Sequence, residues 1–514
     1  MPSHRRLAAL GVVAASALAM AFAGAAPVRA DADCDPTVDN TWTGGINGDG
    51  TWSDASNWSG GVPSSGQTLC FPAAGSLVWL PESFVNNPVV LDGQLTVNAA
   101  SSPGATYHGF DGPITGDGGI TAASGYIFFD TPSTFSGGVT LAGGNVNAEG
   151  AGTLGSGPVS AEDGVLQVDA HGFDNDITLS AQGALVCSDA DGPNPPAGGL
   201  SVSGPIILAG STTVWVDTPC SLSGPISGAY QLTIDNGVTL AVSGTNTYSG
   251  GTVIQEAGFQ GVVSVAGARP LGTGPVRLQS GTLSGTGTIG DVTVATGTAA
   301  TVAGTLAPGT PGQPDTLSTG ALALAGGTKF PIELDSATGF DAVDATGAVS
   351  ISGATLDVTL GTAYQPGPRA AFTIIRNQSG QPVSGTFGGL PEGSALVVGG
   401  TTFYITYQGN GENDVVISTV QPATPTPAPT PLASAYPLAT PAPLTTPTPT
   451  ITSSPRPQPT PIAVTSGSKP RSGGPPMAAL LLAAAALILI AAGLALAFQE
   501  PIRRRATAWR HRGG

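Results

Sequence analysis

The sequence predicts an all-β protein built as a solenoid. Over residues 246–294, Gly-rich turns recur about every 8–10 residues, and the short runs of β-branched and small apolar residues between them leave no room for helices. Strands of roughly 4–6 residues are not stable alone. Each strand therefore needs a neighbour above and below it, as in a stack of coils.

Short motifs that occur twice in the same order also predict a stack. The offsets between the two copies are 113, 117 and 112 residues. A fixed order with a drifting offset favours coils stacked along one axis, with small insertions at the turns. The matching pairs are Phe135–Gly138 (FSGG) with Tyr248–Gly251 (YSGG), Leu154–Val159 (LGSGPV) with Leu271–Val276 (LGTGPV), and Gly112–Gly116 (GPITG) with Gly224–Gly228 (GPISG).

A run of four motifs in the second copy resembles the autotransporter-associated β-strand repeat of passenger-type surface proteins. The motifs are Thr247–Thr252 (TYSGGT), Leu271–Val276 (LGTGPV), Gly285–Gly290 (GTGTIG) and Gly304–Gly309 (GTLAPG). Thr41–Pro63, Leu356–Leu360 and Ser384–Val416 resemble the usual companions of this repeat. The resemblance implies a right-handed parallel β-helix outside the cell. The family shares no catalytic residues, so it implies none here.

Composition and charge limit the classes of partner. With 76 Gly, 45 Pro and 10% charged residues among 514, the chain suits a thin repetitive β structure better than a core of large side chains. Residues 31–420 hold 32 acids and five bases, a net charge of −27, and no Lys or Arg lies between Asp31 and Arg269. Such a surface repels nucleic acid, so we expect no nucleic-acid partner.

The first 30 residues read as a secretory signal. His4 to Arg6 precede an apolar run, and Val28-Arg29-Ala30 provides a small-residue cleavage site before Asp31. The alternative is an N-terminal anchor that is not cleaved. Export would make the next segments extracellular.

Residues 31–110 are predicted to form a Trp-rich β cap. Trp42, Trp52 and Trp58 lie within 17 residues and would cover the open apolar end of a solenoid. The alternative use of exposed indoles is stacking on sugar rings. Asn47 to Gly50 with Asp54 faintly resembles a Ca²⁺ loop, but without the Glu of an EF-hand it reads as a turn.

Four cysteines fall in the exported part, where disulfides form. Four cysteines allow three pairings. We expect the two local pairs, Cys34 with Cys70 and Cys187 with Cys220, because they close loops of comparable length. The absence of C-x-x-C spacing argues against a metal site, and no cofactor is expected.

Residues 111–335 are predicted to form the repeat body and residues 336–420 a C-terminal β region. Alternation at Leu232/Ile234 and Phe330/Ile332 points one face inward. The densest acidic patch comprises Asp163, Asp169, Asp174, Asp176, Asp189 and Asp191. Its aspartates would bind Ca²⁺ only if several converged. The alternative is that they form turns through bonds to their own backbone.

The last 94 residues predict a membrane anchor. Residues 421–476 are rich in Pro and Thr and favour an extended polyproline linker. Met477–Phe498 has 22 uncharged residues, enough for one transmembrane helix, and the Arg-rich residues 499–514 would remain cytoplasmic. The layout resembles that of sorting-enzyme substrates, but no Leu-Pro-x-Thr-Gly is present. The alternating strands of an outer-membrane barrel are also missing.

The leading expectation is a cell-surface β-solenoid with a structural, adhesive or display role, anchored in the membrane and meeting surface glycans or other cells. The second is a carbohydrate-binding module that uses the Trp cluster. An enzyme is not expected. The exported part has two histidines, His108 and His171, far apart in sequence, and no nucleophile elbow. A polysaccharide lyase or glycosidase would draw on Asp163/Asp169 or Asp174/Asp176 as paired carboxylates.

Overall fold

The computed structural model describes residues 33–44, 50–72, 75–81, 83–99, 108–189, 199–255, 261–295 and 303–422. The predicted signal, residues 45–49 of the Asn47 turn, Asp191, the linker from residue 423, the transmembrane helix and the basic tail lie outside these residues. The described residues belong to one compact unit. None of its helices is long and apolar enough to cross a bilayer.

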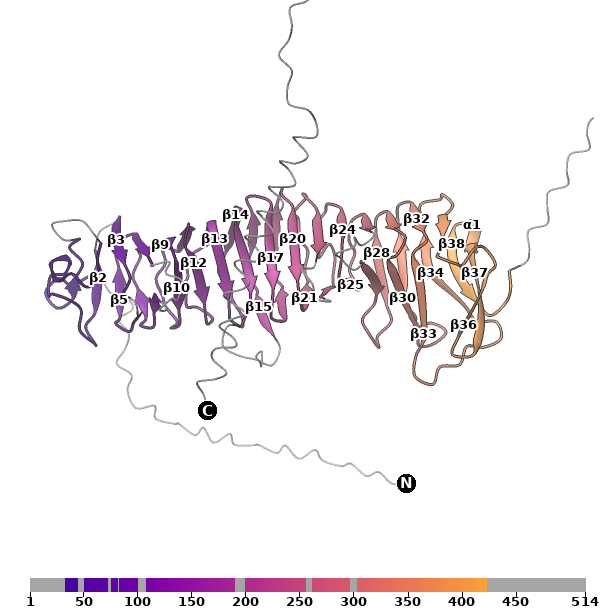
Figure 1. Cartoon of the computed structure of the whole chain (residues 1–514), viewed down its shortest axis with the longest axis horizontal. Helices are drawn as coiled ribbons and strands as arrows, with labels where there is room; N and C mark the ends of the chain where they lie inside the picture. The colour runs from indigo at the N-terminus through magenta and orange to yellow at the C-terminus, as the bar shows by residue number, and fades with distance from the viewer. Residues whose placement is uncertain are drawn as a thin grey trace, which may run out of the picture. The chain divides into compact units, whose positions relative to one another are not determined.

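The described structure is all-β, and most of its strands pair in parallel in long sheets, which confirms the predicted fold class at that level. Figure 1 shows the strands of this unit following one another in sequence order, from β2 to β37. Val139 pairs with Val159 and Leu232 with Thr252, so a regular coil takes 20 residues. Insertions lengthen other coils: Ile177 pairs with Ile206, 29 residues on.

Each regular coil contributes one strand to each of three ladders, named here in the order in which the chain meets them. Ladder 1 begins as a four-stranded sheet of β1 (Asn40–Thr41), β2 (Leu69–Phe71), β5 (Val89–Leu91) and β8 (Ile114–Thr115). Further along the chain its place is taken by an eight-stranded sheet of β15 (Leu200–Val202), β18 (Cys220–Leu222), β21 (Thr239–Val242), β23 (Val262–Val265), β25 (Thr282–Gly285), β27 (Thr305–Pro308), β30 (Lys329–Leu334) and β33 (Thr355–Leu360).

Ladders 2 and 3 share one 20-stranded sheet, because the long strands β13 (Val159–Val168) and β14 (Ile177–Cys187) belong to both. Ladder 2 also holds β3 (Ser76–Trp79), β6 (Leu95–Asn98), β9 (Ile120–Ser124), β11 (Val139–Ala142), β16 (Ile206–Leu208) and β19 (Ile226–Gly228). Ladder 3 also holds β4 (Phe84–Val85), β7 (His108–Phe110), β10 (Tyr126–Phe129), β12 (Asn145–Ala148), β17 (Thr212–Val216), β20 (Leu232–Asn236), β22 (Thr252–Gln255), β24 (Val276–Leu278), β26 (Val292–Val294), β29 (Leu322–Leu324), β32 (Val349–Ser352) and β35 (Ser384–Thr386).

Near the C-terminal end of the unit, a six-stranded sheet replaces ladder 2. Its order is β28 (Thr316–Thr319), β31 (Ala342–Ala345), β34 (Ala371–Asn377), β38 (Asp414–Ser418), β37 (Thr401–Gln408) and β36 (Ala395–Val398). The last strands pair antiparallel and close the stack. The only helical segments in the described residues are a 3₁₀ turn, η1 (Ala55–Asn57), and a distorted turn, α1 (Gly409–Glu412).

The interior is a set of apolar side chains stacked in register. In ladder 2, seven inward positions on successive coils are each at most 2% exposed. They are Leu95, Ile120, Val139, Val159, Ile177, Ile206 and Ile226. Burying one such side chain contributes about 1.5–3 kcal/mol, so each short strand is stabilised by the coils on either side.

The ladders run across both predicted boundaries of the repeat body. Val89 pairs with Ile114 on one side, and Lys329 pairs with Thr355 on the other. The predicted cap, repeat body and C-terminal β region are therefore continuous parts of one stack.

The coils stack along one axis, as the repeated motifs predict, but the two copies of the motif do not lie above one another. Ile114 of the first copy lies in ladder 1, whereas its counterpart Ile226 lies in ladder 2. Val139 lies in ladder 2, and its counterpart Thr252 lies in ladder 3. The offset between the copies is therefore not a whole number of coils. The same motif forms a corner between different pairs of ladders in its two copies.

Candidate functional site

The three tryptophans proposed for sugar stacking are buried. Trp42, Trp52 and Trp58 are 4%, 7% and 4% exposed. The ring of Trp58 lies 4.9 Å from each of the other two indoles, edge-on, and 5.7 Å from Phe71. Its indole N–H donates to the carbonyl of Trp52 at 2.9 Å. These indoles fill the end of the stack as a cap, so their faces are not available to a sugar.

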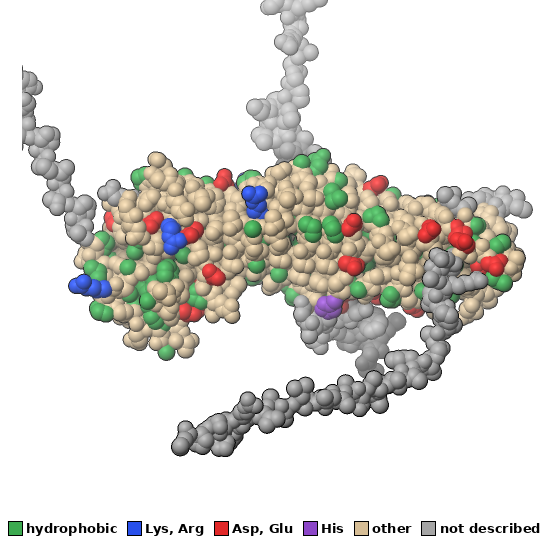
Figure 2. All heavy atoms as spheres, turned by 180° about the vertical axis from the view of Figure 1, so that it is seen from behind, with side chains coloured by type: hydrophobic (Ala, Val, Ile, Leu, Met, Phe, Trp, Pro, Cys, Tyr) green, Lys and Arg blue, Asp and Glu red, His purple; other side chains and the backbone are tan. Residues whose placement is uncertain are grey.

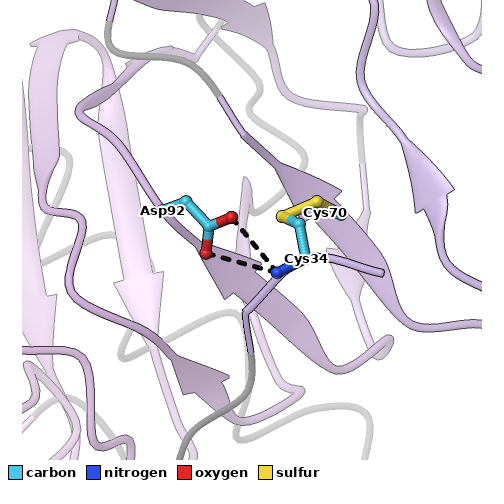
Figure 3. Close-up of side chains that lie close together, drawn as sticks. All are labelled: Cys34, Cys70 and Asp92. Carbon is cyan, nitrogen blue, oxygen red and sulfur yellow. Dashed lines mark hydrogen bonds between the residues drawn. A yellow bond between two sulfur atoms is a disulfide. The ribbon is translucent and has the colours of Figure 1, made fainter. Parts of the chain in front are cut away.

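The structure joins Cys34 to Cys70 and Cys187 to Cys220. Figure 3 shows Asp92 facing the first pair, and its carboxylate accepts the N–H of Cys34 at 3.1 Å. Among the described residues, these two cysteines and Asp92 are the only three metal-ligating side chains that lie within 4.8 Å of one another. Both sulfurs are in the disulfide, so the group ties residues 33–41 to the cap and has no thiolate to offer a metal ion.

The acidic patch does not form one groove in the described residues. Asp163 is exposed at the bend where β13 passes from ladder 2 to ladder 3, and Asp169 follows the other end of that strand. The six intervening steps of extended chain span roughly 20 Å, too far for paired glycosidase carboxylates. Asp174 and Asp176 are exposed at the corner before β14. On the face shown in Figure 2, acidic side chains lie at separate places along the coils.

The two histidines are also apart. His108 is 4% exposed in β7, and its Nδ1 donates to the carbonyl of Pro81 at 2.7 Å. His171 is exposed after β13, in a later coil. Neither faces the other as a catalytic pair would need.

Burial perturbs three titratable groups near the interior. Asp341 is 7% exposed, and burial raises its pKa to about 6, aided by the charges of Glu333 and Asp335 and opposed by N–H bonds from Glu333 and Asp315. Burial also raises the pKa of the Tyr407 hydroxyl to about 12 and that of Tyr248 further. Through these two backbone bonds, the carboxylate of Asp341 joins the segment between β27 and β28 to strand β30.

A depression of about 180 Å³ lies where two successive coils meet at the corner that follows ladder 1. It was not expected from the sequence. Its lining is Arg269, Gly272, Thr273, Thr288, Ile289 and Gly290. The one signal that points to it is that Arg269 is the first Lys or Arg after Asp31.

Within the described part of the chain, the single ion pair joins Arg376 and Asp344, with a nitrogen–oxygen distance of 2.6 Å. The Arg376 side chain is 50% exposed, so the pair contributes about 0–1 kcal/mol. Arg269, which lines the depression and is exposed, therefore has no acidic ion-pair partner among the described residues.

Comparison with protein-family models, with curated proteins and with solved structures gives no match for this chain.

Proposed function

We propose that the chain is a cell-surface β-solenoid with a structural, adhesive or display role, held at the membrane by Met477–Phe498. The observation that carries this proposal is the in-register apolar stack, closed by aromatic residues at both ends of the described unit. Such a stack grows by adding coils and presents long outer faces. At the far end Phe330 stacks on Phe387 at 5.7 Å, whereas the indoles at the near end meet edge-on.

The outer faces support a role at an aqueous surface. In ladder 2, the outward positions on five successive coils all carry hydroxyl groups: Thr96, Thr121, Thr140, Ser160 and Thr178. Together with the net charge of −27 over residues 31–420, these hydroxyls keep the outside hydrated and soluble. The predicted signal, Pro/Thr-rich linker and apolar segment would then place this unit outside the cell.

We further propose that the coils are right-handed and that the chain is related to the autotransporter-associated β-strand repeat proteins. Parallel crossover connections are right-handed in about 98% of cases. The shared motifs support the relationship because they form the same corner twice. Ser156 N–H donates to the Phe135 carbonyl at 3.0 Å, and Thr273 N–H donates to the Tyr248 carbonyl at 2.8 Å.

Deleting Met477–Gly514 is expected to release the body into the medium, because the deletion removes the only apolar segment long enough to span a bilayer after the predicted signal. A full-length variant with Ile488→Arg and Ile490→Arg should behave in the same way, because each central Arg costs about 2.5–3.5 kcal/mol of insertion. The measurement is immunoblotting of washed cells and of medium.

The matched control deletes only Gln499–Gly514, which leaves the apolar segment in place. Its body should stay with the cells. If the Met477–Gly514 deletion and the double Arg variant also remain cell-bound, another part of the chain holds it and the proposed anchor is wrong.

A further inference from the structure

Arg269 is held in a backbone conformation that its own residue type disfavours. Its φ is 62°, in the left-handed region that favours Gly, and the following Pro270 adds to the strain by disfavouring compact conformations before it. Three backbone bonds fix it there. Its N–H donates to Thr288 at 2.9 Å, and its carbonyl accepts from Asn246 and Gly272, each at 3.1 Å. Such strain persists where the surroundings over-determine it, and it is enriched at functional sites.

The depression beside Arg269 offers several kinds of contact at one place. Arg269 is exposed and carries a rigid fork of donors, and the exposed Thr273 and Thr288 carry hydroxyls. The Thr273 hydroxyl donates to the Tyr248 carbonyl at 3.3 Å and can still accept a hydrogen bond from a ligand. The floor is formed by Ile289, which is only 4% exposed, and by the backbone of Gly272 and Gly290. A Cβ added at Gly272 would lie 2.4 Å from the Tyr248 carbonyl, so the bare backbone here is fixed by packing.

We propose that this depression binds a single acidic sugar, with the carboxylate of the sugar on the fork of Arg269. A sugar acid has a carboxylate for the guanidinium and hydroxyls for the two threonines. The guanidinium pairs with a carboxylate through two parallel N–H···O bonds. No described acidic residue competes for it as an ion pair.

Charge around the depression selects a monoanion over a polyanion. Asp291 directly follows the lining residue Gly290, is exposed, and accepts the Ala321 N–H at 2.8 Å, which holds its carboxylate near this corner. Residues 31–420 carry a net charge of −27. The acidic surface would repel each additional negative charge on a dianionic phosphate or on a chain of uronates. The ligand class is therefore one acidic sugar, free or at the end of a neutral glycan.

The test is titration of the full-length chain, in a polyoxyethylene detergent that carries no sugar, with glucuronic acid, glucose and glucose 6-phosphate at one ionic strength. Calorimetry or ligand-observed NMR should show glucuronic acid binding at least tenfold more tightly than either of the other sugars. Arg269→Ala should weaken glucuronic acid binding at least tenfold. Arg277→Ala, which removes an exposed Arg on β24 that does not line the depression, should leave it unchanged.

The variant Arg269→Gly distinguishes an effect on ligand binding from an effect on protein stability. Gly adopts φ near 62° without strain, so this variant should raise the melting temperature by roughly 2 °C while it abolishes binding. The proposal is overturned if wild-type protein does not bind glucuronic acid, if glucose or glucose 6-phosphate binds as well, or if Arg277→Ala costs as much as Arg269→Ala. Binding does not depend on where the chain is anchored, so failure here leaves the membrane proposal standing.

Discussion

Replacing Gly157 with Ala is expected to destabilise the body by about 3 kcal/mol, at the upper end of what overpacking costs. A Cβ at this position would lie 2.3 Å from the Gly138 nitrogen and 2.4 Å from the Ser136 carbonyl oxygen. Both atoms belong to the backbone of the preceding coil, so no side chain can move aside to make room. The midpoint of denaturant unfolding measures the loss.

Gly367→Ala is the matched control, because nothing lies within 4 Å of a Cβ there and its φ is not in the left-handed region. Its effect should be near zero or stabilising by less than about 1 kcal/mol. Gly274→Ala should repeat the large loss, since its Cβ would meet Gly251 N and Ser249 O at 2.5 Å each. Equal midpoints for Gly157→Ala and Gly367→Ala would mean that the coils do not approach so closely.

Trp58→Ala is expected to cost about 3–5 kcal/mol, as the loss of a buried aromatic side chain does. Trp58 is 4% exposed and contacts Trp42, Trp52 and Phe71. The cavity left behind opens the apolar end of the stack to water. The unfolding midpoint should fall, and limited proteolysis should cut first near β2.

Trp79→Ala serves as the comparison within the same region. Trp79 faces out from β3 and is 43% exposed, so its removal should cost less than about 1 kcal/mol. If the loss of Trp79 were as damaging as the loss of Trp58, the indole cluster would not be the cap of the stack.

The sequence predicts the fold class because strand chemistry is local. The apolar residues Leu232 and Ile234 alternate with polar ones, and this pattern shows which face of the strand is buried without any knowledge of the neighbouring strands. The side of the coil that a strand occupies is not local. The same Gly-Pro pair precedes Ile114 in ladder 1 and Ile226 in ladder 2, because a corner specifies a bend and not a position among three sides.

The candidate site could be predicted only in part. The burial of the Trp42, Trp52 and Trp58 indoles agrees with the cap that their crowding suggested. The outward position of Trp79 could have been read from the alternation with Val78, which is fully buried. The depression at Arg269 could not be predicted, because its lining combines residues of successive coils whose register depends on insertion lengths.

The central claim is that successive coils stack in register, and spin-label distances along ladder 2 test it most directly. Labels replace the outward residue Thr96 together with Thr178 or Ser227, which lie four and six coils away by strand register. Each coil adds about 4.8 Å, so the separations should be roughly 19 and 29 Å before the label linkers are added. A stack predicts two narrow distributions about 10 Å apart. Equal distances, or a shorter distance for the pair with Ser227, would contradict it.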